Sequence, residues 1–549
     1  MKTSAALVNL AWAGSNANRF LQYRAALRDP AAAQVRLLRQ YLRANRDTEF
    51  GKKHAFSRLR TPADFRAAVP LRTFDDYGPY VDRIAGGETN VLTRQPVRRL
   101  VPSGGSTRAR KLVPYTADLQ AEFNAAIGPW VCDLFRRDPA FMAGPAYWSV
   151  SPVVQCPADT NGSAVPVGFD DDSAYLGGAW GRLVGAAFAV PSAVRHVPDV
   201  ETFRYVTLLC LLRAAELRLV SVWHPSFLTL LLDDLSPRFA ELVRDVAGGT
   251  CTPDVPPAVR AALTAAPQPR RAAALEGVGP KDLRGIWPRL GLVSCWADAH
   301  AALHVDVLAA RFPGVRVQPK GLISTEAFVS LPFAGLHPLA VRSHFFEFLE
   351  DGGAARLAHE LERGGEYRVV VTTGGGLYRY ALNDRVRVDG FVGRTPSVRF
   401  VGKEDHVSDL FGEKLSEGFV GELLRHLFAR HGLAPRFAML GPETDPGPAA
   451  YVLFLDVSGN VASSSGMLAR DLDVALCANP HYRYCRDLGQ LAPARVHAVP
   501  RDGYAAYVAE CRRRGQRLGD VKAMPLSRHT GWSAVFGPAL ETAGEPRQR

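Results

Sequence analysis

The chain has 549 residues, of which 47% are hydrophobic, and it carries a formal net charge of +12. This length exceeds what one hydrophobic core usually supports, so two or more domains are expected. The 66 lysines and arginines are scattered along the sequence and match no nucleic-acid-binding motif, so no nucleic acid is expected as a partner.

The cysteines and the apolar runs indicate a compartment. The eight cysteines are dispersed without a CxxC pair, which argues against zinc ribbons and disulfide frameworks and favours a reducing compartment, the cytoplasm. Residues 5–14 resemble a weak secretory signal, but Asn9 interrupts them and helical periodicity continues, so an N-terminal helix is predicted. Charged residues between 213 and 218 break the longest apolar run, so no membrane span is expected.

A stretch rich in serine, glycine and basic residues, 102–113, follows a predicted strand over 97–101. Hydroxyls and glycines fill positions 103–107, and Arg108, Arg110 and Lys111 come next. A glycine-rich turn can direct several backbone N–H groups at one anion, and neighbouring cations then neutralise it. The stretch predicts a polyphosphate cradle, with an ordinary surface loop as the alternative. A helix over 116–135 is predicted next, which would place the loop between a strand and a helix N-terminus.

The middle of the chain alternates helical and strand patterns. Residues 200–235 read as helices, and 247–285, rich in Ala, Pro and Gly, are predicted to form an exposed insertion. Buried strands are predicted within 286–296 and over 321–326, which implies a largely parallel sheet. Ligands bind outside the carboxyl ends of such strands, where Ser324, Thr325 and Glu326 would lie.

The last third predicts strands around a glycine turn at 374–376, followed by Asn383 and Asp384, and then a separate unit. That unit combines helices over 416–432, 464–477 and 503–517 with strands over 436–440, 449–457 and 494–499. The predicted fold class is α/β. A large N-terminal domain (1–402) would hold mostly parallel β-sheets flanked by helices, and a smaller mobile α+β C-terminal domain would span 403–549.

Several short motifs occur in a characteristic order. They are Thr48-Glu49-Phe50-Gly51, Val222-Trp223-His224-Pro225-Ser226-Phe227-Leu228, Val293-Ser294-Cys295-Trp296, Thr372-Thr373, Gly376-Leu377-Tyr378-Arg379-Tyr380, Gly412-Glu413-Lys414-Leu415 and Asn479-Pro480-His481-Tyr482. With them, the sequence resembles the Gretchen Hagen (auxin-responsive promoter) acyl acid amido synthetases, within the superfamily that also holds acyl-CoA synthetases and luciferases. The resemblance implies ATP-dependent activation of a carboxylic acid to an acyl-adenylate, followed by transfer to an amine, usually of an amino acid.

The resemblance also implies the site residues. Ser103, Gly104, Ser106, Thr107 and Lys111 match the phosphate loop, Thr325 the α-phosphate contact, Glu326 the Mg²⁺ ligand, Asp384 the ribose contact, and Lys522 a catalytic lysine of the small domain, and Ser324 is a further nucleotide-binding residue. Lys111 and Thr325 are expected to act in catalysis with Lys522. The sequence departs from the family pattern at Gly105, Arg108, Ala381 and Asn383, which puts full activity in question.

Two other functions stay open at this point. An acyl-CoA ligase shares the first half-reaction and differs only in the acceptor, and a non-catalytic nucleotide- or acyl-binding protein would keep the fold without turnover. The aromatic side chains Trp223, Phe227 and Trp296 either line an acyl pocket or belong to the core. The identities of the acid and of the amine depend on the shape of the pocket.

Overall fold

The computed structural model describes residues 2–103, 111–149, 163–168, 185–298, 301–403, 407–444, 448–457, 465–499, 502–514, 516 and 521–537. Contacts divide the chain into two compact units. The first unit is Met1–Trp296 with Arg311–Phe400, and the second is Ala297–Ala310 with Val401–Arg549. Within the described ranges, no helix combines the length and apolar character that crossing a membrane requires.

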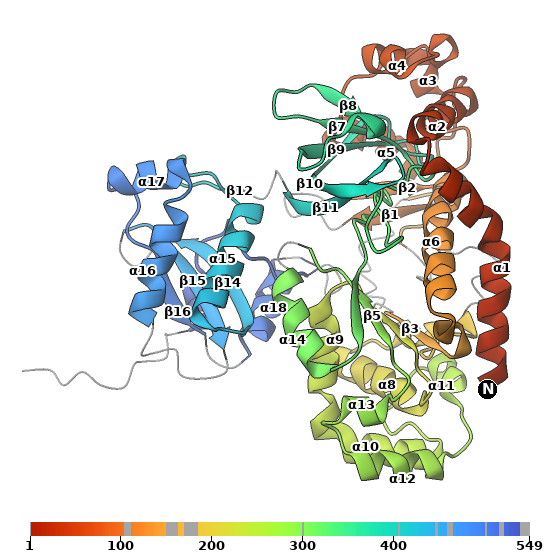
Figure 1. The fold of residues 1–549 in the computed structure, drawn as a ribbon, viewed down its shortest axis with the longest axis vertical. Helices are drawn as coiled ribbons and strands as arrows, with labels where there is room; N and C mark the ends of the chain where they lie inside the picture. Colours follow the sequence, from red (N-terminus) through yellow and green to blue (C-terminus); the bar gives the residue numbers. More distant parts are fainter. Residues whose placement is uncertain are drawn as a thin grey trace, which may run out of the picture. The chain divides into compact units, whose positions relative to one another are not determined.

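Helices make up much of the first unit. They are α1 (Lys2–Ala26), α2 (Pro30–Ala44), α3 (Glu49–Lys53), α4 (Pro62–Ala68), α5 (Phe74–Ala85), α6 (Ala117–Arg137), α8 (Val200–Arg213), α9 (Pro225–Asp233), α10 (Leu235–Gly248), α11 (Pro257–Leu263), α12 (Pro269–Val278) and α13 (Leu283–Ile286). Figure 1 shows α1 and α6 side by side. Gly128 permits this approach, because a Cβ there would lie 2.5 Å from Asn16 Oδ1. The predicted N-terminal helix is confirmed and is divided at Asp29, which caps α2.

A four-stranded parallel sheet forms one layer of the first unit. Its strands are β3 (Ala146–Trp148), β4 (Leu219–Ser221), β5 (Leu292–Cys295) and β6 (Arg316–Pro319), which lie in that order. The prediction of a strand over 321–326 is wrong, because β6 ends at Pro319 and no strand covers these residues. Gly321 ends the extended run, because its φ of +79° belongs to the left-handed region and a Cβ there would lie 2.6 Å from Ser330 O.

The stretch 247–285 forms α11, α12 and the start of α13, and most of its residues are exposed, as predicted. Val259 of α11 and Leu275 of α12 are fully buried. Asp245 accepts hydrogen bonds from the hydroxyls of Tyr205 and Thr250, at 2.7 and 2.6 Å, which fixes the chain beyond α10. The Ala, Pro and Gly content therefore reflects short helices, of which α11 and α12 begin with proline in the first turn.

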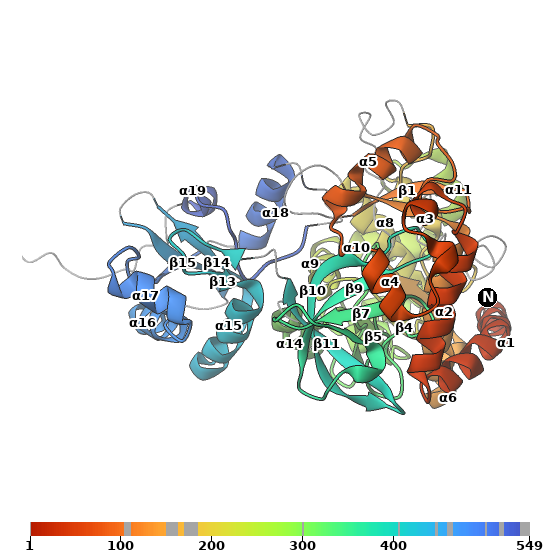
Figure 2. The same cartoon turned by 90° about the horizontal axis from the view of Figure 1, so that it is seen from above.

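A five-stranded antiparallel sheet forms the other large layer of the first unit. The strand order is β11 (Thr395–Lys403, of which 401–403 fall in the second unit), β10 (Tyr380–Val392), β9 (Glu366–Thr372), β7 (Phe345–Leu349) and β8 (Ala355–Leu357). All five residues of β7 are buried, and α2 lies beside this strand (Figure 2). The predicted α/β class is confirmed, with this antiparallel sheet in addition to the parallel one.

The second unit is organised around β14 (Pro435–Glu443), β15 (Ala450–Val457) and β16 (Arg495–Ala498). Its remaining elements are α14 (Ala302–Arg311, of which Arg311 falls in the first unit), β12 (Val407–Ser408), β13 (Leu415–Ser416), α15 (Glu417–His431), α16 (Ser465–Leu476), α17 (Pro480–Asp487), α18 (Gly503–Arg513) and α19 (Trp532–Phe536). Alternate residues of β14 and β15 face opposite helical layers. Leu440 and Leu453 pack with α15, α16 and α17, whereas Met439 and Phe454 pack with α18 and α19 (Figure 2).

Candidate functional site

The predicted phosphate loop joins two paired strands. β1 (Arg99–Ser103) and β2 (Lys111–Tyr115) are antiparallel, and Ser103 pairs with Lys111. Gly104, Ser106 and Thr107 lie outside the described residues. The loop therefore lies between two strands, and β2 separates it from the α6 N-terminus. Five residues containing a proline are too short a run to be identified as a strand by periodicity. Lys111 is half-buried, with Nζ 5.9 Å from the centre of the Phe74 ring.

Ser324, Thr325 and Glu326 form a tight turn beyond β6. The Ser324 N–H donates to Ala327 O at 2.9 Å, and the Ala327 N–H donates to Ser324 Oγ at 3.1 Å. Thr325 is half-buried and Glu326 is buried. The turn thus fixes a hydroxyl and a carboxylate at successive positions, although the sequence predicts a strand there.

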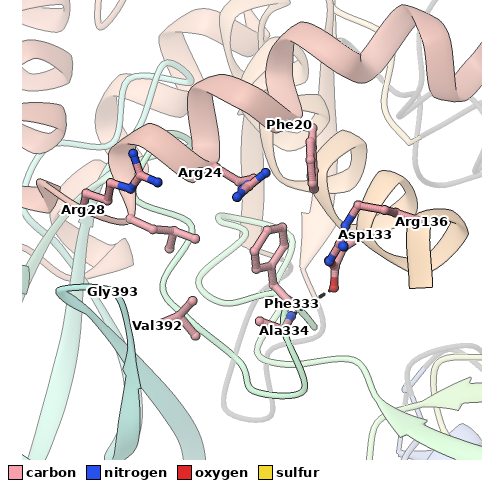
Figure 3. A pocket seen from close by; sticks show the side chains of 10 residues that line it. Phe20, Arg24, Arg28, Asp133, Arg136, Phe333, Ala334, Val392 and Gly393 are labelled. Atoms are coloured by element: carbon pink, nitrogen blue, oxygen red, sulfur yellow. Dashed lines mark hydrogen bonds and ion pairs between the residues drawn. The ribbon is translucent and has the colours of Figure 1, made fainter.

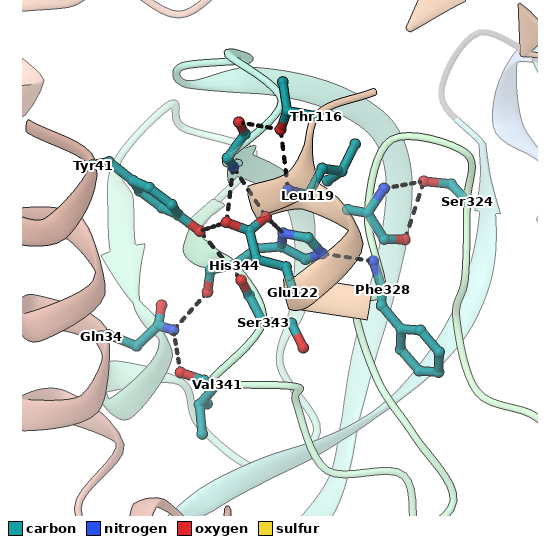
Figure 4. Close-up of polar contacts among 12 residues, drawn as sticks. Gln34, Tyr41, Thr116, Leu119, Glu122, Ser324, Phe328, Val341, Ser343 and His344 are labelled. Atoms are coloured by element: carbon teal, nitrogen blue, oxygen red, sulfur yellow. Dashed lines mark hydrogen bonds and ion pairs between the residues drawn. The ribbon is translucent and has the colours of Figure 1, made fainter. Parts of the chain in front are cut away.

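A buried hydrogen-bond network centred on Glu122 connects this turn to α6 and to the glycine turn (Figure 4). The Glu122 carboxylate accepts from the Tyr41 hydroxyl at 2.7 Å, from the Gly374 N–H at 2.9 Å and from His344 Nδ1 at 2.9 Å. Burial, reinforced by Glu122, raises the pKa of Tyr41 well above its ordinary value, so this hydroxyl stays a donor. We refer to these four residues as the Glu122 network.

His344 links the Glu122 network to the turn that carries Glu326. Its Nε2 accepts from the Phe328 N–H at 2.9 Å, so its proton is on Nδ1, which donates to Glu122. Phe328 is two residues from Glu326. On the other side, Thr116 caps α6 and donates its hydroxyl to Gly374 O at 2.9 Å. The network therefore joins the end of β2, the glycine turn and the Ser324–Glu326 turn.

Sequence reasoning did not identify Glu122 or His344. Glu122 lies on the apolar face of α6, where its neighbours Leu119, Phe123 and Ala126 are all buried. A carboxylate within an apolar helical stripe was the available signal, because burying a charge is costly unless it is hydrogen-bonded. His344 precedes a buried strand and carries no comparable signal.

Asp384 lies in β10 at an irregularity in the ladder with β9. The pairing register shifts between Ala381 and Arg385, and Asn383 has a φ of +59°. Bulges of this kind change the direction of a side chain, and Asn tolerates the left-handed region better than most residues. Asn383 is thus compatible with a position where the family pattern has glycine. Asp384 is 3% exposed, and it lies in the first unit.

Lys522 lies in the second unit and is half-buried. Its carbonyl oxygen accepts a hydrogen bond from the Tyr507 hydroxyl at 2.9 Å, which ties its segment to α18. Its role stays a prediction, since the first unit carries the other predicted residues.

The buried polar side chains of the first unit fit a nucleotide and a hard cation. Glu326 and Asp384 supply buried carboxylates, and the fully buried Thr373 hydroxyl has no hydrogen-bond partner within the described ranges. Carboxylate oxygens suit Mg²⁺, and hydroxyls suit phosphate or ribose oxygens. The described residues contain no cluster of three or more His, Cys, Asp or Glu that could hold a metal by themselves. A cation at Glu326 would need oxygens from elsewhere, such as those of a phosphate.

Lys320, a further residue that sequence reasoning did not identify, is buried directly after β6, and its Nζ donates to Ser221 Oγ at 2.5 Å.

A separate surface pocket of about 290 Å³ is lined by Arg24, Arg28 and Arg136, with Phe20 and Phe333 as apolar walls (Figure 3). It includes none of the residues predicted from the sequence.

Family models match the chain in three consecutive parts. The GH3 family N-terminal domain matches residues 20–317, the GH3 family central domain matches 337–403, and the GH3 family C-terminal domain matches 425–530. The probable indole-3-acetic acid-amido synthetase GH3.12 of Oryza sativa subsp. japonica is 26% identical, over 90% of this chain and 91% of the relative. The indole-3-acetic acid-amido synthetase GH3.2 of Arabidopsis thaliana is 25% identical, over 80% and 86%.

Solved structures share the fold. The acyl acid amido synthetase AtGH3.15 in complex with 2,4-DB has a TM-score of 0.81 at 20% identity, and the match covers 92% of this chain and 93% of that chain. A 2-hydroxyisobutyryl-CoA ligase in the postadenylation state has a TM-score of 0.53 at 13% identity, with 91% of both chains covered. The family predicted from the motifs is confirmed: the chain belongs to the GH3 family.

Proposed function

We propose that this chain is an ATP-dependent ligase that adenylates a carboxylic acid and transfers the acyl group to an amine, usually of an amino acid, to form an amide. The observation that carries the proposal is the match of all three GH3 domains, in order, between residues 20 and 530. Relatives named as indole-3-acetic acid-amido synthetases support the amide-forming step.

The phosphates of ATP would be bound at the β1–β2 hairpin. Ser103, Gly104, Ser106, Thr107 and Lys111 would hold the phosphates through backbone N–H groups, hydroxyls and one ammonium. Such donors stabilise the negative charge that develops on pyrophosphate as it leaves. Pairing of Ser103 with Lys111 supports this role, because it fixes both ends of the loop.

The Ser324–Glu326 turn and β10 would complete the nucleotide site. Ser324 and Thr325 would donate to the α-phosphate, Glu326 would bind Mg²⁺, and the Asp384 carboxylate would accept from both ribose hydroxyls. Mg²⁺ would supply charge neutralisation between phosphate oxygens. The Glu122 network supports this assignment, because it fixes the backbone beside Glu326 to the helix that follows the loop.

Lys522 would act on the reacting groups from the second unit. A cation beside the acid carboxylate and the α-phosphate would stabilise the charge that develops during adenylation. A location in the cytoplasm is part of the proposal. The seven cysteines within the described ranges support it, because all are free.

The experiment is pyrophosphate exchange into ATP, with Mg²⁺, over a panel of carboxylic acids and without any amine. Acids that support exchange are then incubated with amino acids or with CoA, and the products are identified by mass spectrometry. We expect exchange and an amide, and loss of exchange in Glu326→Gln. Glu276→Gln, on the exposed face of α12, is the matched control. A folded protein without exchange overturns the proposal, and a thioester without an amide identifies a CoA ligase.

A further inference from the structure

A buried lysine lies at the carboxyl edge of the parallel sheet. The Lys320 N–H donates to Cys295 O at 3.0 Å and so continues the ladder one residue beyond β6. Its side chain is 8% exposed, and Nζ lies 2.5 Å from Ser221 Oγ at the end of β4. The ammonium therefore reaches from the end of β6, across the intervening strand β5, to the end of β4.

Two indole rings flank this ammonium. Its Nζ lies 5.2 Å from the centre of the Trp130 ring and 5.9 Å from that of Trp223. Trp130 belongs to α6 and donates Nε1–H to Gln318 Oε1 at 3.0 Å, whereas Trp223 is 44% exposed. One ring is thus fixed in the interior, and the other reaches the surface.

The ammonium lacks a compensating charge. Within the described ranges, no carboxylate forms an ion pair with Lys320, although buried lysines are normally paired. Burial lowers the pKa of Lys320 to about 8, so the hydroxyl and the two rings do not replace the lost hydration. A methionine would fill the same space without this penalty, which means that packing alone does not account for the lysine.

Ser294 is a second serine at this edge of the sheet, next to Ser221. Ser221 and Ser294 are register partners on β4 and β5, so their side chains project from the same face of the sheet. Ser294 is fully buried, and its Oγ has no hydrogen-bond partner among the residues that the structure describes. An ammonium, an unpaired hydroxyl and two aromatic rings thus converge where parallel sheets bind ligands.

We propose that Lys320 binds a carboxylate of the acid substrate, while Trp130 and Trp223 pack against its apolar body. The inference rests on the proposed function and adds the residues that hold the acid, which are Lys320 for its carboxylate and the two indole rings for its apolar body. A carboxylate supplies the missing opposite charge, and Ser294 adds a hydrogen bond. A free amino acid fits poorly as the acid, because its α-ammonium would face the ammonium of Lys320.

The test measures binding of benzoate and indole-3-acetate without ATP, by tryptophan fluorescence, against their uncharged amides. The wild-type protein is expected to prefer each acid over its amide by roughly 10–100-fold, since a charged hydrogen bond is lost with the amide. Lys320→Met is expected to remove this preference and to leave ATP affinity unchanged. Lys281→Met, at an exposed position, is the matched control and keeps the preference.

A second variant addresses the rings. Because Trp223 is largely exposed, Trp223→Leu is expected to fold normally and to weaken benzoate binding more than hexanoate binding. The inference is overturned if Lys320→Met keeps the acid preference, if ATP affinity falls as much as acid affinity, or if the wild-type protein binds no carboxylate. Acid binding that depends on Lys320, without pyrophosphate exchange for any acid, supports the inference and overturns the proposed function.

Discussion

Replacing Glu122 by glutamine tests whether the Glu122 network holds the site together. The carboxylate accepts from a hydroxyl, a backbone N–H and an imidazole N–H, and every one of these donors is buried. Glutamine replaces one acceptor oxygen by an NH₂ group. If that group faces His344, it meets Nδ1–H, and the imidazole cannot move its proton to Nε2, because Nε2 accepts from Phe328.

The opposite orientation of the glutamine has its own cost. The NH₂ group then faces the Tyr41 hydroxyl, and Gly374 N–H keeps only its 3.0 Å contact to the remaining oxygen. Either orientation leaves a buried donor poorly paired, which costs about 1–3 kcal/mol, and weakens the other hydrogen bonds by removing the charge. We expect Glu122→Gln to lower the free energy of unfolding of the first unit by about 2–4 kcal/mol.

Urea unfolding followed by tryptophan fluorescence measures this change, since seven of the eight tryptophans lie between residues 1 and 296, in the first unit. Tyr41→Phe removes one of the three donors and is expected to cost about 0.5–1.5 kcal/mol. Glu276→Gln, at an exposed helical position, is expected to change nothing. A Glu122→Gln protein as stable as the wild type would show that these hydrogen bonds contribute no net stability.

The same variant tests positioning. Phe328 loses its fixed acceptor when His344 turns, so the backbone beside Glu326 becomes less constrained. We expect pyrophosphate exchange to fall by roughly tenfold or more at temperatures where the variant is fully folded, because small displacements of positioning groups have large kinetic effects. Unchanged exchange in a destabilised protein would limit the network to a structural role.

Three further predictions concern single residues. Asp384→Ala is expected to weaken ATP binding by about 1.5–3 kcal/mol while acid binding changes little, and an unchanged ATP affinity by calorimetry would exclude Asp384 from the site. Lys522→Ala is expected to slow single-turnover adenylation by roughly 10²–10³-fold at nearly normal ATP affinity. A wild-type rate would show that Lys522 takes no part in adenylation. Burial lowers the pKa of Lys320 to about 8, below its unfolded value of about 10.4, so the folded state binds fewer protons between these values and stability rises with pH there. Relative to Lys320→Met, the free energy of unfolding of the wild-type protein is expected to rise on the order of 2 kcal/mol between about pH 7.5 and about pH 10. Cys295 is the titratable neighbour that acts on Lys320. If urea unfolding gives the same difference between the two proteins at every pH, the lowered pKa is contradicted.

Long periodic elements could be predicted from the sequence, and short ones could not. The helix predicted over 416–432 is α15, and the strands predicted over 449–457 and 494–499 are β15 and β16. The three residues of β4 are too few to establish the alternation of a strand, and all three are buried, so no local signal indicated this strand of the parallel sheet. The end of the extended run at Gly321 could be identified only from the structure, because the contact with Ser330 requires a glycine there.

The candidate site shows the same division. Motif order pointed to Ser324, Thr325, Glu326 and Asp384, because each belongs to a short run with its own composition. Glu122, His344 and Lys320 derive their roles from partners far away in sequence: Lys320 lies 99 residues from Ser221, and Glu122 lies 222 residues from His344. Such pairs depend on tertiary structure, which local pattern does not encode.

The Glu122 network has a consequence for synthesis of the chain on the ribosome. Gly374 is made 252 residues after Glu122, which corresponds to roughly 13–50 s at typical elongation rates. During that interval the carboxylate must stay hydrated, so the face of α6 that contains it cannot close. A fragment ending at residue 317, the limit of the N-terminal family match, lacks both His344 and Gly374. Such a fragment would expose the apolar residues around Glu122 to solvent, and the first unit becomes a complete folding unit only when the glycine turn has emerged.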